Sequence, residues 1–448
     1  MSYQAGITAG NTLQLRSGTA RGGSLLWHQI SGATIVASFF MPYIFNGIVR
    51  IDHVLSAVAI CYLVLLSLHN GKVSIPRDIK AFFVLSFAVL CYSAFRLLLP
   101  TDNFLLSLQY LVQYAYLFFG VAIFVLARSS LSRSLSGVML TLAICGVLVN
   151  LVAIYQILAP QSELVVRLLE LYGGRETETQ EYGEYYSKAA EILLGGGQAI
   201  SIFTGMQGLA IFNLFFLAIA IGVVKDKERN RTARVVFIAG SVLAIIGGLV
   251  SGSKTFVIGL PTLLAILTLF RIGSLFQVAA LLGLLLGLGE ILRTFSYQLD
   301  DIFRHVTELD FGELLAGRYG AQGHLTEVMA VTFEPMTLLF GLGVDAARFN
   351  YADNQFRQVI LVGGLPLFVL YYMTLGSLLY LAWKKRNVSL YAKPLFALGI
   401  VFIIGGIGMD IHFQARTIVL WIIVNILLLT RVNDSRIQFP AKPRKQPA

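Results

Sequence analysis

Between Gln198 and Val224 the chain reads QAISIFTGMQGLAIFNLFFLAIAIGVV, without one charged residue. The hydrocarbon core of a bilayer is about 30 Å thick, and a helix of roughly 17–25 apolar residues crosses it. The stretch therefore predicts a transmembrane helix, because only helices or closed barrels satisfy the backbone in lipid, and the run is too long for a barrel strand. Over the 448 residues, 56% are hydrophobic and only 13% are charged, which excludes a soluble globular protein.

Similar apolar runs recur along the chain and predict an all-α fold, a polytopic transmembrane bundle of about twelve helices. The chain is expected to form a single integral membrane domain over residues 1–448, without a cleavable signal peptide. The predicted spans are 25–49, 52–69, 81–99, 104–127, 136–158, 198–224, 235–252, 255–270, 274–292, 355–383, 390–411 and 417–430.

Basic residues predict the orientation of the bundle. With the N-terminus inside, most of the 34 lysines and arginines fall in cytoplasmic segments, and the flipped topology inverts this bias. Both termini are therefore expected in the cytoplasm, with residues 431–448 as a basic tail near anionic membrane lipid. The net charge of +10 then reflects topology, and no nucleic-acid partner is needed to explain it.

Two long segments interrupt the pattern, and both are predicted on the outer face. The first, 159–198, contains an amphipathic stretch from Glu163 to Tyr172, typical of a helix at a membrane surface. The second, 293–353, is rich in glycine toward its end. Loops of this length are uncommon unless they are functional, so binding or chemistry is expected on the outer face.

Ionisable side chains cost roughly 2.5–3.5 kcal/mol at the bilayer centre, so those near the predicted spans are candidates for a site. Lys254, in Ser-Gly-Ser-Lys-Thr at the outward end of the seventh span, faces a bound anion or simply snorkels to the interface. Arg318 lies among glycines, where the backbone can approach a ligand closely. His324 and Glu327 are three residues apart on a predicted short helix and so share one of its faces. They are either an acid–base pair or a pair of solvated loop residues.

Three further groups lie near the outer ends of spans. Asp353 and Arg357 are either a helix N-cap with an i,i+4 ion pair or part of a site. Another cluster precedes the last span, with Asp410, His412 and Arg416. Arg96, near the end of the third span, is interpreted as a snorkelling arginine.

These outer residues suggest cations gathered around a diphosphate. The cysteines Cys61, Cys91 and Cys145 are interpreted as packing residues, and no metal-site spacing or cofactor motif is present. Basic side chains could stabilise a leaving diphosphate directly, while a single His, Asp or Glu takes the proton from an attacking hydroxyl. Taken alone, the residues predict an outer-face site for an anionic, lipid-borne ligand.

Four motifs extend this interpretation through a resemblance. They are Ser251-Gly-Ser-Lys-Thr255, Gly317-Arg318, Glu334-Pro-Met-Thr-Leu-Leu-Phe-Gly-Leu-Gly343 and Asp353-Asn-Gln-Phe-Arg-Gln-Val-Ile-Leu-Val-Gly-Gly-Leu-Pro366. In this order they resemble the bacterial O-antigen polymerase/ligase superfamily, with Wzy-type polymerases and their ligase relatives. The resemblance covers roughly residues 198–383 in motif and the whole chain in topology.

The resemblance implies a GT-C-like fold and a metal-independent glycosyltransferase of the bacterial inner membrane that uses undecaprenyl-diphosphate-linked sugars. It places diphosphate-binding cations at Lys254 and Arg318, to which Arg357 and Arg416 are added as candidates. The catalytic base remains open between His324, Asp353 and His412. A co-polymerase that regulates chain length is a further partner to expect.

Three classes of function remain. A polymerase transfers a growing glycan to the hydroxyl of another lipid-linked repeat unit, and Asp353-Asn354 favours it over a ligase, which usually carries His-Asn there. A ligase transfers the glycan to a glycolipid or protein. A transporter of lipid-linked precursors would place charges along a central path, whereas here they collect outside. A peptidoglycan-type glycosyltransferase fits the glycine and Asp-Asn motifs poorly.

Overall fold

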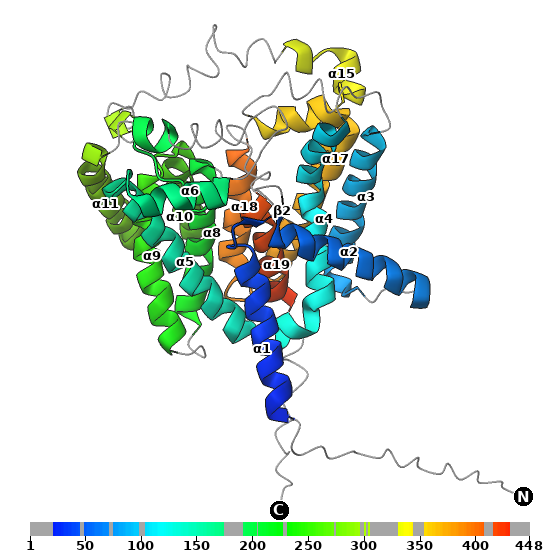
Figure 1. Cartoon of the computed structure of the whole chain (residues 1–448), viewed down its shortest axis with the longest axis horizontal. Helices are drawn as coiled ribbons and strands as arrows, with labels where there is room; N and C mark the ends of the chain where they lie inside the picture. Colours follow the sequence, from blue (N-terminus) through cyan, green and yellow to red (C-terminus); the bar gives the residue numbers. More distant parts are fainter. Residues whose placement is uncertain are drawn as a thin grey trace, which may run out of the picture.

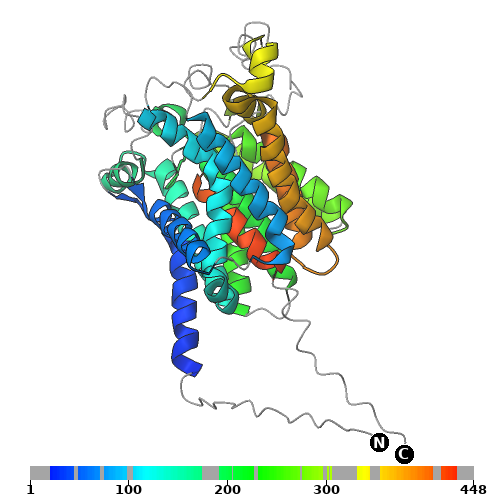
Figure 2. The same cartoon turned by 90° about the vertical axis from the view of Figure 1, so that its right-hand side faces the viewer.

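The fold is a helical bundle (Figures 1 and 2), known from a computed structural model. The structure describes residues 21–44, 49–70, 75–97, 104–173, 191–203, 205–226, 231–272, 275–295, 300–301, 303–304, 330–343, 354–406 and 415–430. Its longer helices are α1 (Arg21–Ser38), α2 (Ile51–Asn70), α3 (Lys80–Arg96), α4 (Phe104–Arg133), α5 (Leu135–Leu158), α6 (Glu163–Gly173), α8 (Met206–Lys225), α9 (Arg231–Val250), α10 (Lys254–Leu269), α11 (Leu275–Leu292), α17 (Gln355–Lys384), α18 (Ala392–Gly405) and α19 (Ala415–Thr430).

Short elements connect the helices. They are the 3-10 turns η1 (Arg77–Ile79) and η3 (Arg293–Phe295), the π-helical turn η2 (Glu191–Gly195) and the helix α15 (Pro335–Phe340). Two-residue strands, β1 (Tyr43–Ile44) and β2 (Val49–Arg50), pair antiparallel between α1 and α2. Apart from these two strands, the described elements are helical, which confirms the predicted all-α fold class.

Among the residues that the structure describes, six helical segments are long and apolar enough to cross a membrane, by length and composition. They are Arg77–Arg96, Leu111–Arg128, Leu135–Leu158, Met206–Lys225, Arg231–Val250 and Gln355–Lys384. Each of the twelve predicted spans overlaps one described helix, yet Ile51–Leu66, Lys254–Leu269, Leu281–Leu292, Ala392–Gly405 and Arg416–Thr430 are shorter apolar helices. The apolar helices are thus compatible with a membrane protein, while the count of twelve crossings stays a prediction.

Several predicted boundaries are wrong. The span 25–49 contains a helix only as far as Ser38, because the chain then turns through β1 and β2. The span 198–224 begins with non-helical backbone, and its helix starts at Met206. In Figure 1, α2 runs sideways from the bundle at a steep angle to the upright α1, whereas two consecutive spans would be antiparallel.

The centre of the bundle is built on α8. This helix is largely apolar, with Asn213 as a buried polar residue, and most of its residues are buried. Close packing depends on small residues of the neighbouring helices. A Cβ atom at Gly146 of α5 would lie 2.3 Å from the Phe216 ring, and one at Gly240 of α9 would lie 2.8 Å from it. Small residues at helix contacts allow this close approach in membranes, where lipid is as apolar as leucine and gives no hydrophobic driving force.

The predicted surface helix in the first long loop exists as α6, but part of its apolar face packs on protein. Val165 and Leu169 are buried against Leu193 and Ile200, in a small cluster separate from the main core. Leu164, in the same apolar stretch, is exposed, as a residue that faces the membrane would be. One side of α6 is therefore anchored to the bundle.

The segments predicted to be cytoplasmic meet at one end of the bundle. Nζ of Lys385, just after α17, lies 2.9 Å from Oδ2 of Asp78 in η1. Nζ of Lys225, at the end of α8, donates to the carbonyl of Ile272, 2.6 Å away. These contacts join segments that the basic-residue bias places on one side, while the side itself stays a prediction.

Cysteine labelling tests the orientation. Gln161, before α6, and Asn387, after α17, are both exposed. We expect Gln161→Cys to react in intact cells with a membrane-impermeant thiol reagent and Asn387→Cys to react only after permeabilisation, because the positive-inside rule places them on opposite sides. The parent chain, with its three native cysteines, sets the background. Labelling of Asn387→Cys in intact cells would show that the predicted orientation is wrong.

Candidate functional site

Arg416, the second residue of α19, is the predicted diphosphate ligand with the most extensive described contacts. Its side chain is buried, at 5% exposure. Nη1 donates to the carbonyl of Ile202, 2.7 Å away, and the guanidinium lies 5.2 Å from the centre of the Tyr172 ring. Its charge also acts on Asp52 and His53 at the start of α2. Arg416 of α19 therefore contacts α6 and the segment before α8, and its charge acts on the start of α2.

The start of α2 adds a buried ion pair. Nε and Nη2 of Arg50 donate to the two carboxylate oxygens of Asp52, at 2.9 and 2.8 Å. This two-pronged geometry satisfies the carboxylate, and Asp52 also suits the positive end of the helix dipole. The next residue differs: Nε2 of His53 is buried, and no hydrogen-bond partner for it exists among the described residues.

Tyr172 closes the cluster from α6. Its hydroxyl donates to the carbonyl of Phe40, 3.0 Å away. Burial raises the pKa of the Tyr172 phenol, and the nearby positive charge of Arg416 acts in the opposite direction. The phenol stays neutral and serves as a hydrogen-bond donor. We name Arg50, Asp52, His53, Tyr172 and Arg416 together the Arg416 cluster.

The carbonyl that Arg416 binds belongs to a segment held by a buried glutamine. Oε1 of Gln156, on α5, accepts from the backbone N–H groups of Ile200 and Ser201, at 3.1 and 2.7 Å, and its Nε2 donates to the Ser201 carbonyl at 3.1 Å. Ser201 has a φ of +55°, which is uncommon for a residue other than glycine. The side chain of Gln156 thus fixes a strained backbone next to Ile202.

Lys254 is connected to the same segment. It begins α10 after a turn in which Ser251 and Ser253 are buried and Gly252 has a φ of +58°. Nε2 of Gln198 donates to the Gly252 carbonyl at 3.1 Å. The turn before Lys254 and the side chain of Arg416 therefore both contact residues 198–202, although Lys254 and Arg416 are far apart in the sequence.

Arg357 lies in a second polar region, at the start of α17. Its side chain is buried, and its backbone N–H donates to Oδ1 of Asn354 at 3.2 Å. The N-cap is therefore Asn354, and the N-cap role predicted for Asp353 is wrong. The N–H of Gln355 donates to the Gly406 carbonyl at 2.9 Å, which joins the start of α17 to the end of α18.

Arg96 is not a snorkelling residue. Its side chain is buried, and its Nε donates to the carbonyl of Val362, 3.2 Å away. That carbonyl cannot bond within α17, because Pro366, four residues later, has no N–H. The hydroxyl of Tyr92 donates to the neighbouring carbonyl of Gly363, at 2.9 Å. Residues of α3 therefore donate hydrogen bonds to two backbone carbonyls at the kink in α17.

The other predicted site residues, His324, Asp353, His412 and Arg318, lie outside the described residues, as do Glu327 and Asp410. Sequence reasoning missed Arg50, Asp52, His53, Tyr172 and Gln156. A signal for the first two was present, since Arg50 and Asp52 stand two apart where two apolar runs meet. In the described part of the chain, no three His, Cys, Asp or Glu side chains come together as a metal site would require.

Chemically, the Arg416 cluster can bind an anion. Arg416 supplies a positive charge, His53 supplies a ring nitrogen without a described partner, and α2 directs its positive dipole end to the same place. Tyr172 is a neutral neighbour.

Comparison with known proteins gives no match, either to a family model or to a curated protein.

Proposed function

We propose that the chain is a polysaccharide polymerase of the bacterial inner membrane. It transfers a glycan from undecaprenyl diphosphate to a hydroxyl of another lipid-linked repeat unit, on the outer face, with both termini in the cytoplasm. The observation that carries the proposal is the buried guanidinium of Arg416 at the end of an apolar bundle. A buried charge is costly in a membrane protein and is a functional candidate by default.

The chemistry we propose needs cations and one base. The acceptor hydroxyl oxygen forms a bond to the anomeric carbon, the bond from that carbon to the diphosphate breaks, and its electron pair leaves with the diphosphate. Arg416 and Lys254 stabilise the developing negative charge, with Arg318 and Arg357 as further cations of the same role. The hydroxyl proton passes to His324, Asp353 or His412, and a chain-length-regulating co-polymerase remains a proposed partner.

The distribution of charge supports an enzyme over a transporter. In α3, α5, α8, α9, α10, α17, α18 and α19, every lysine, arginine, aspartate and glutamate lies within the first or last turn. Secondary transporters bind substrates and coupling ions near the bilayer midplane. The charged groups of these helices lie instead at the helix ends. Four of them, Arg96, Lys254, Arg357 and Arg416, lie at ends predicted to face outward, the side on which we place the diphosphate of the carrier lipid.

The lipid-linked products of a deletion strain test the proposal. Without a polymerase, we expect single repeat units on the carrier lipid and surface glycan limited to one unit, because chain growth stops. Mass spectrometry of extracted carrier lipids distinguishes the outcomes. Long polymer on the carrier would indicate a ligase, and precursors retained inside the cell would indicate a transporter; either result overturns the polymerase.

A further inference from the structure

The short helix α15 exposes apolar side chains and buries polar ones. Thr332, just before the helix, and Thr337, within it, are both buried. The exposed side of the same segment carries large apolar side chains, with exposures between 49% and 68%; they are Phe333, Met336, Leu339 and Phe340. A helix in an aqueous loop turns its apolar side to the protein and its polar side to water. The opposite arrangement here indicates that α15 faces lipid.

α15 has a fixed position against α17. The N–H of Leu342 donates to the carbonyl of Leu361, 2.6 Å away. A Cβ atom at Gly341 would lie 2.7 Å from the Gly363 nitrogen, so the two backbones meet without a side chain between them. Figures 1 and 2 show α15 at the end of the bundle where α17 begins. The exposed apolar side chains are therefore held at one defined place on the bundle.

An apolar pocket joins the surface of α15 to that of α17. Its lining comes from both helices: Leu339 and Phe340 from α15, and Leu365, Pro366, Val369 and Leu370 from α17. Leu365, Val369 and Met373 are exposed at four-residue spacing, which places them on one face of α17. Because α17 is long and apolar enough to cross a membrane, this face is turned to lipid. The apolar surface of α15 continues it.

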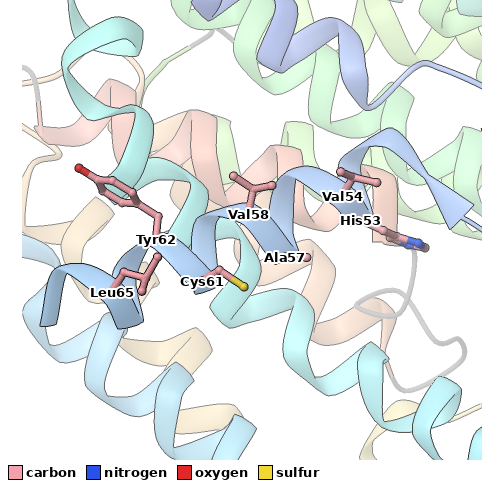
Figure 3. A pocket seen from close by; sticks show the side chains of 7 residues that line it. All are labelled: His53, Val54, Ala57, Val58, Cys61, Tyr62 and Leu65. Carbon is pink, nitrogen blue, oxygen red and sulfur yellow. The ribbon is translucent and has the colours of Figure 1, made fainter. Parts of the chain in front are cut away.

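Exposed apolar rows also occur on other helices of the bundle. Figure 3 shows one on α2, formed by the exposed side chains of Val54, Val58 and Tyr62. Both α2 and α17 belong to predicted spans, where lipid is expected to cover such a row. α15 belongs instead to the second long loop, predicted on the outer face. Its exposed apolar side chains therefore indicate a lipid contact that the sequence did not predict.

The length of α17 indicates the depth of α15 in the membrane. Lys384, the last residue of α17, marks the boundary predicted on the cytoplasmic side. Leu365 lies about 28 Å from it along the helix, at 1.5 Å per residue, and the hydrocarbon core is about 30 Å thick. Leu365 therefore lies near the outer boundary of the hydrocarbon, and Phe340 lies beside it in the shared pocket. Glu334, exposed at the start of α15, suits the level of the headgroups.

We infer that α15 is a membrane anchor, which inserts its exposed apolar side chains into the leaflet at the start of α17, the outer one in the predicted orientation. Residues 330–343 contain no lysine or arginine that would select an anionic headgroup, so we assign the contact to the acyl chains of bulk lipid. The anchor fixes the end of the second loop beside the bend of α17. This inference does not depend on the polymerase proposal.

Collisions of a spin label with two reagents test the contact. The purified full chain, with its three native cysteines replaced by alanine, is reconstituted in phosphatidylcholine vesicles with a nitroxide on Met336→Cys. We expect frequent collisions with oxygen and few with a water-soluble nickel chelate, at a depth of about 5–10 Å below the headgroup boundary, as for an interfacial helix. Val369→Cys provides the lipid reference, and Gln161→Cys, exposed before α6, provides the aqueous one.

Two results of this measurement would contradict the inference. A label at Met336 that meets the nickel chelate as often as the label at Gln161 lies in water. A label that rarely meets either reagent is covered by protein, such as a second copy of the chain. In both cases α15 is not a lipid anchor.

A matched pair of substitutions tests whether the apolar side chains cause the insertion. With the label on Phe340→Cys, Met336→Asp should move the label toward water, because a charge is costly among acyl chains. Met336→Leu should leave the depth of the label unchanged. If the depth is also unchanged in Met336→Asp, contacts with α17 alone position α15, and its exposed side chains do not anchor it. These measurements need no catalysis, so a failed anchor is distinguishable from a failed polymerase proposal.

Discussion

Polymer synthesis falls about 10²–10³-fold in Arg416→Ala, which is the loss expected when one preorganised donor to a developing anion is removed. Arg416→Lys should also be impaired, because an ammonium group lacks the planar fork of donors that matches a phosphate. The surface glycan, separated by chain length on a gel, measures both variants against the parent in cells that lack the native gene.

Arg416 also holds the carbonyl of Ile202, so a loss of activity could come from the fold. Leaving that buried carbonyl unpaired costs about 1–3 kcal/mol. Arg416→Gln separates the two effects, since an amide can still donate to Ile202 but carries no charge. We expect its melting temperature in detergent to stay closer to that of the parent than the melting temperature of Arg416→Ala, while its activity is lost.

Arg386 provides the matched control. Its Nη1 donates to the Trp383 carbonyl at 3.0 Å, and its guanidinium lies 4.1 Å from the centre of the Trp383 ring. These contacts resemble those of Arg416, but Arg386 follows α17 at the end of the bundle predicted to be cytoplasmic. Arg386→Ala should therefore keep its activity. Full activity in Arg416→Ala would remove Arg416 from the mechanism.

The sequence predicted the helices well because long apolar runs leave the backbone few alternatives in lipid. The prediction from sequence failed where polar side chains form hydrogen bonds with the backbone in place of those within a helix. Residues 198–203 are as apolar as the helix after them, yet Gln156 holds them in a non-helical conformation through contacts about 45 positions away in the sequence. Hydropathy alone does not reveal such a contact.

In the candidate site, too, some features could be predicted from the sequence and others could not. Lys254 and Arg416 were identifiable as cations near the ends of spans, because an ionisable group is rare there. The contacts that residues 198–202 make with Arg416 and with the turn before Lys254 depend on how the helices pack, which the local sequence pattern does not specify. His53 was missed because, within the sequence, it is one polar residue at the start of an apolar run.

The largest effect on folding is expected at the kink of α17. Gly364 has φ +66° and ψ −165°, and Gly341 has φ +72° and ψ +170°. This region is essentially restricted to glycine, and other residues there cost about 1–3 kcal/mol. The two glycines also pack against each other's segments: a Cβ atom at Gly364 would lie 2.4 Å from the Leu339 carbonyl oxygen, and one at Gly341 would lie 2.7 Å from the Gly363 nitrogen.

The consequences extend to the residues that the kink connects. The N–H of Leu342 donates to the Leu361 carbonyl at 2.6 Å, while Arg96 and Tyr92 bind the next two carbonyls. A side chain at Gly364 pushes α15 away and breaks this set of hydrogen bonds. Because each buried group left unpaired costs about 1–3 kcal/mol, the total exceeds what a marginally stable protein tolerates.

We therefore expect Gly364→Ala to prevent accumulation of folded protein, measured as the monodisperse fraction of a fluorescent fusion on size-exclusion chromatography. Gly376→Ala is the matched control in the same helix, since a Cβ atom there meets nothing within 4 Å. It should leave the melting temperature unchanged or raise it, because alanine is favoured over glycine in a helix interior by about 0.5–1 kcal/mol. If both variants fold equally well, the kink does not require a glycine, and the close approach of α15 to α17 is wrong.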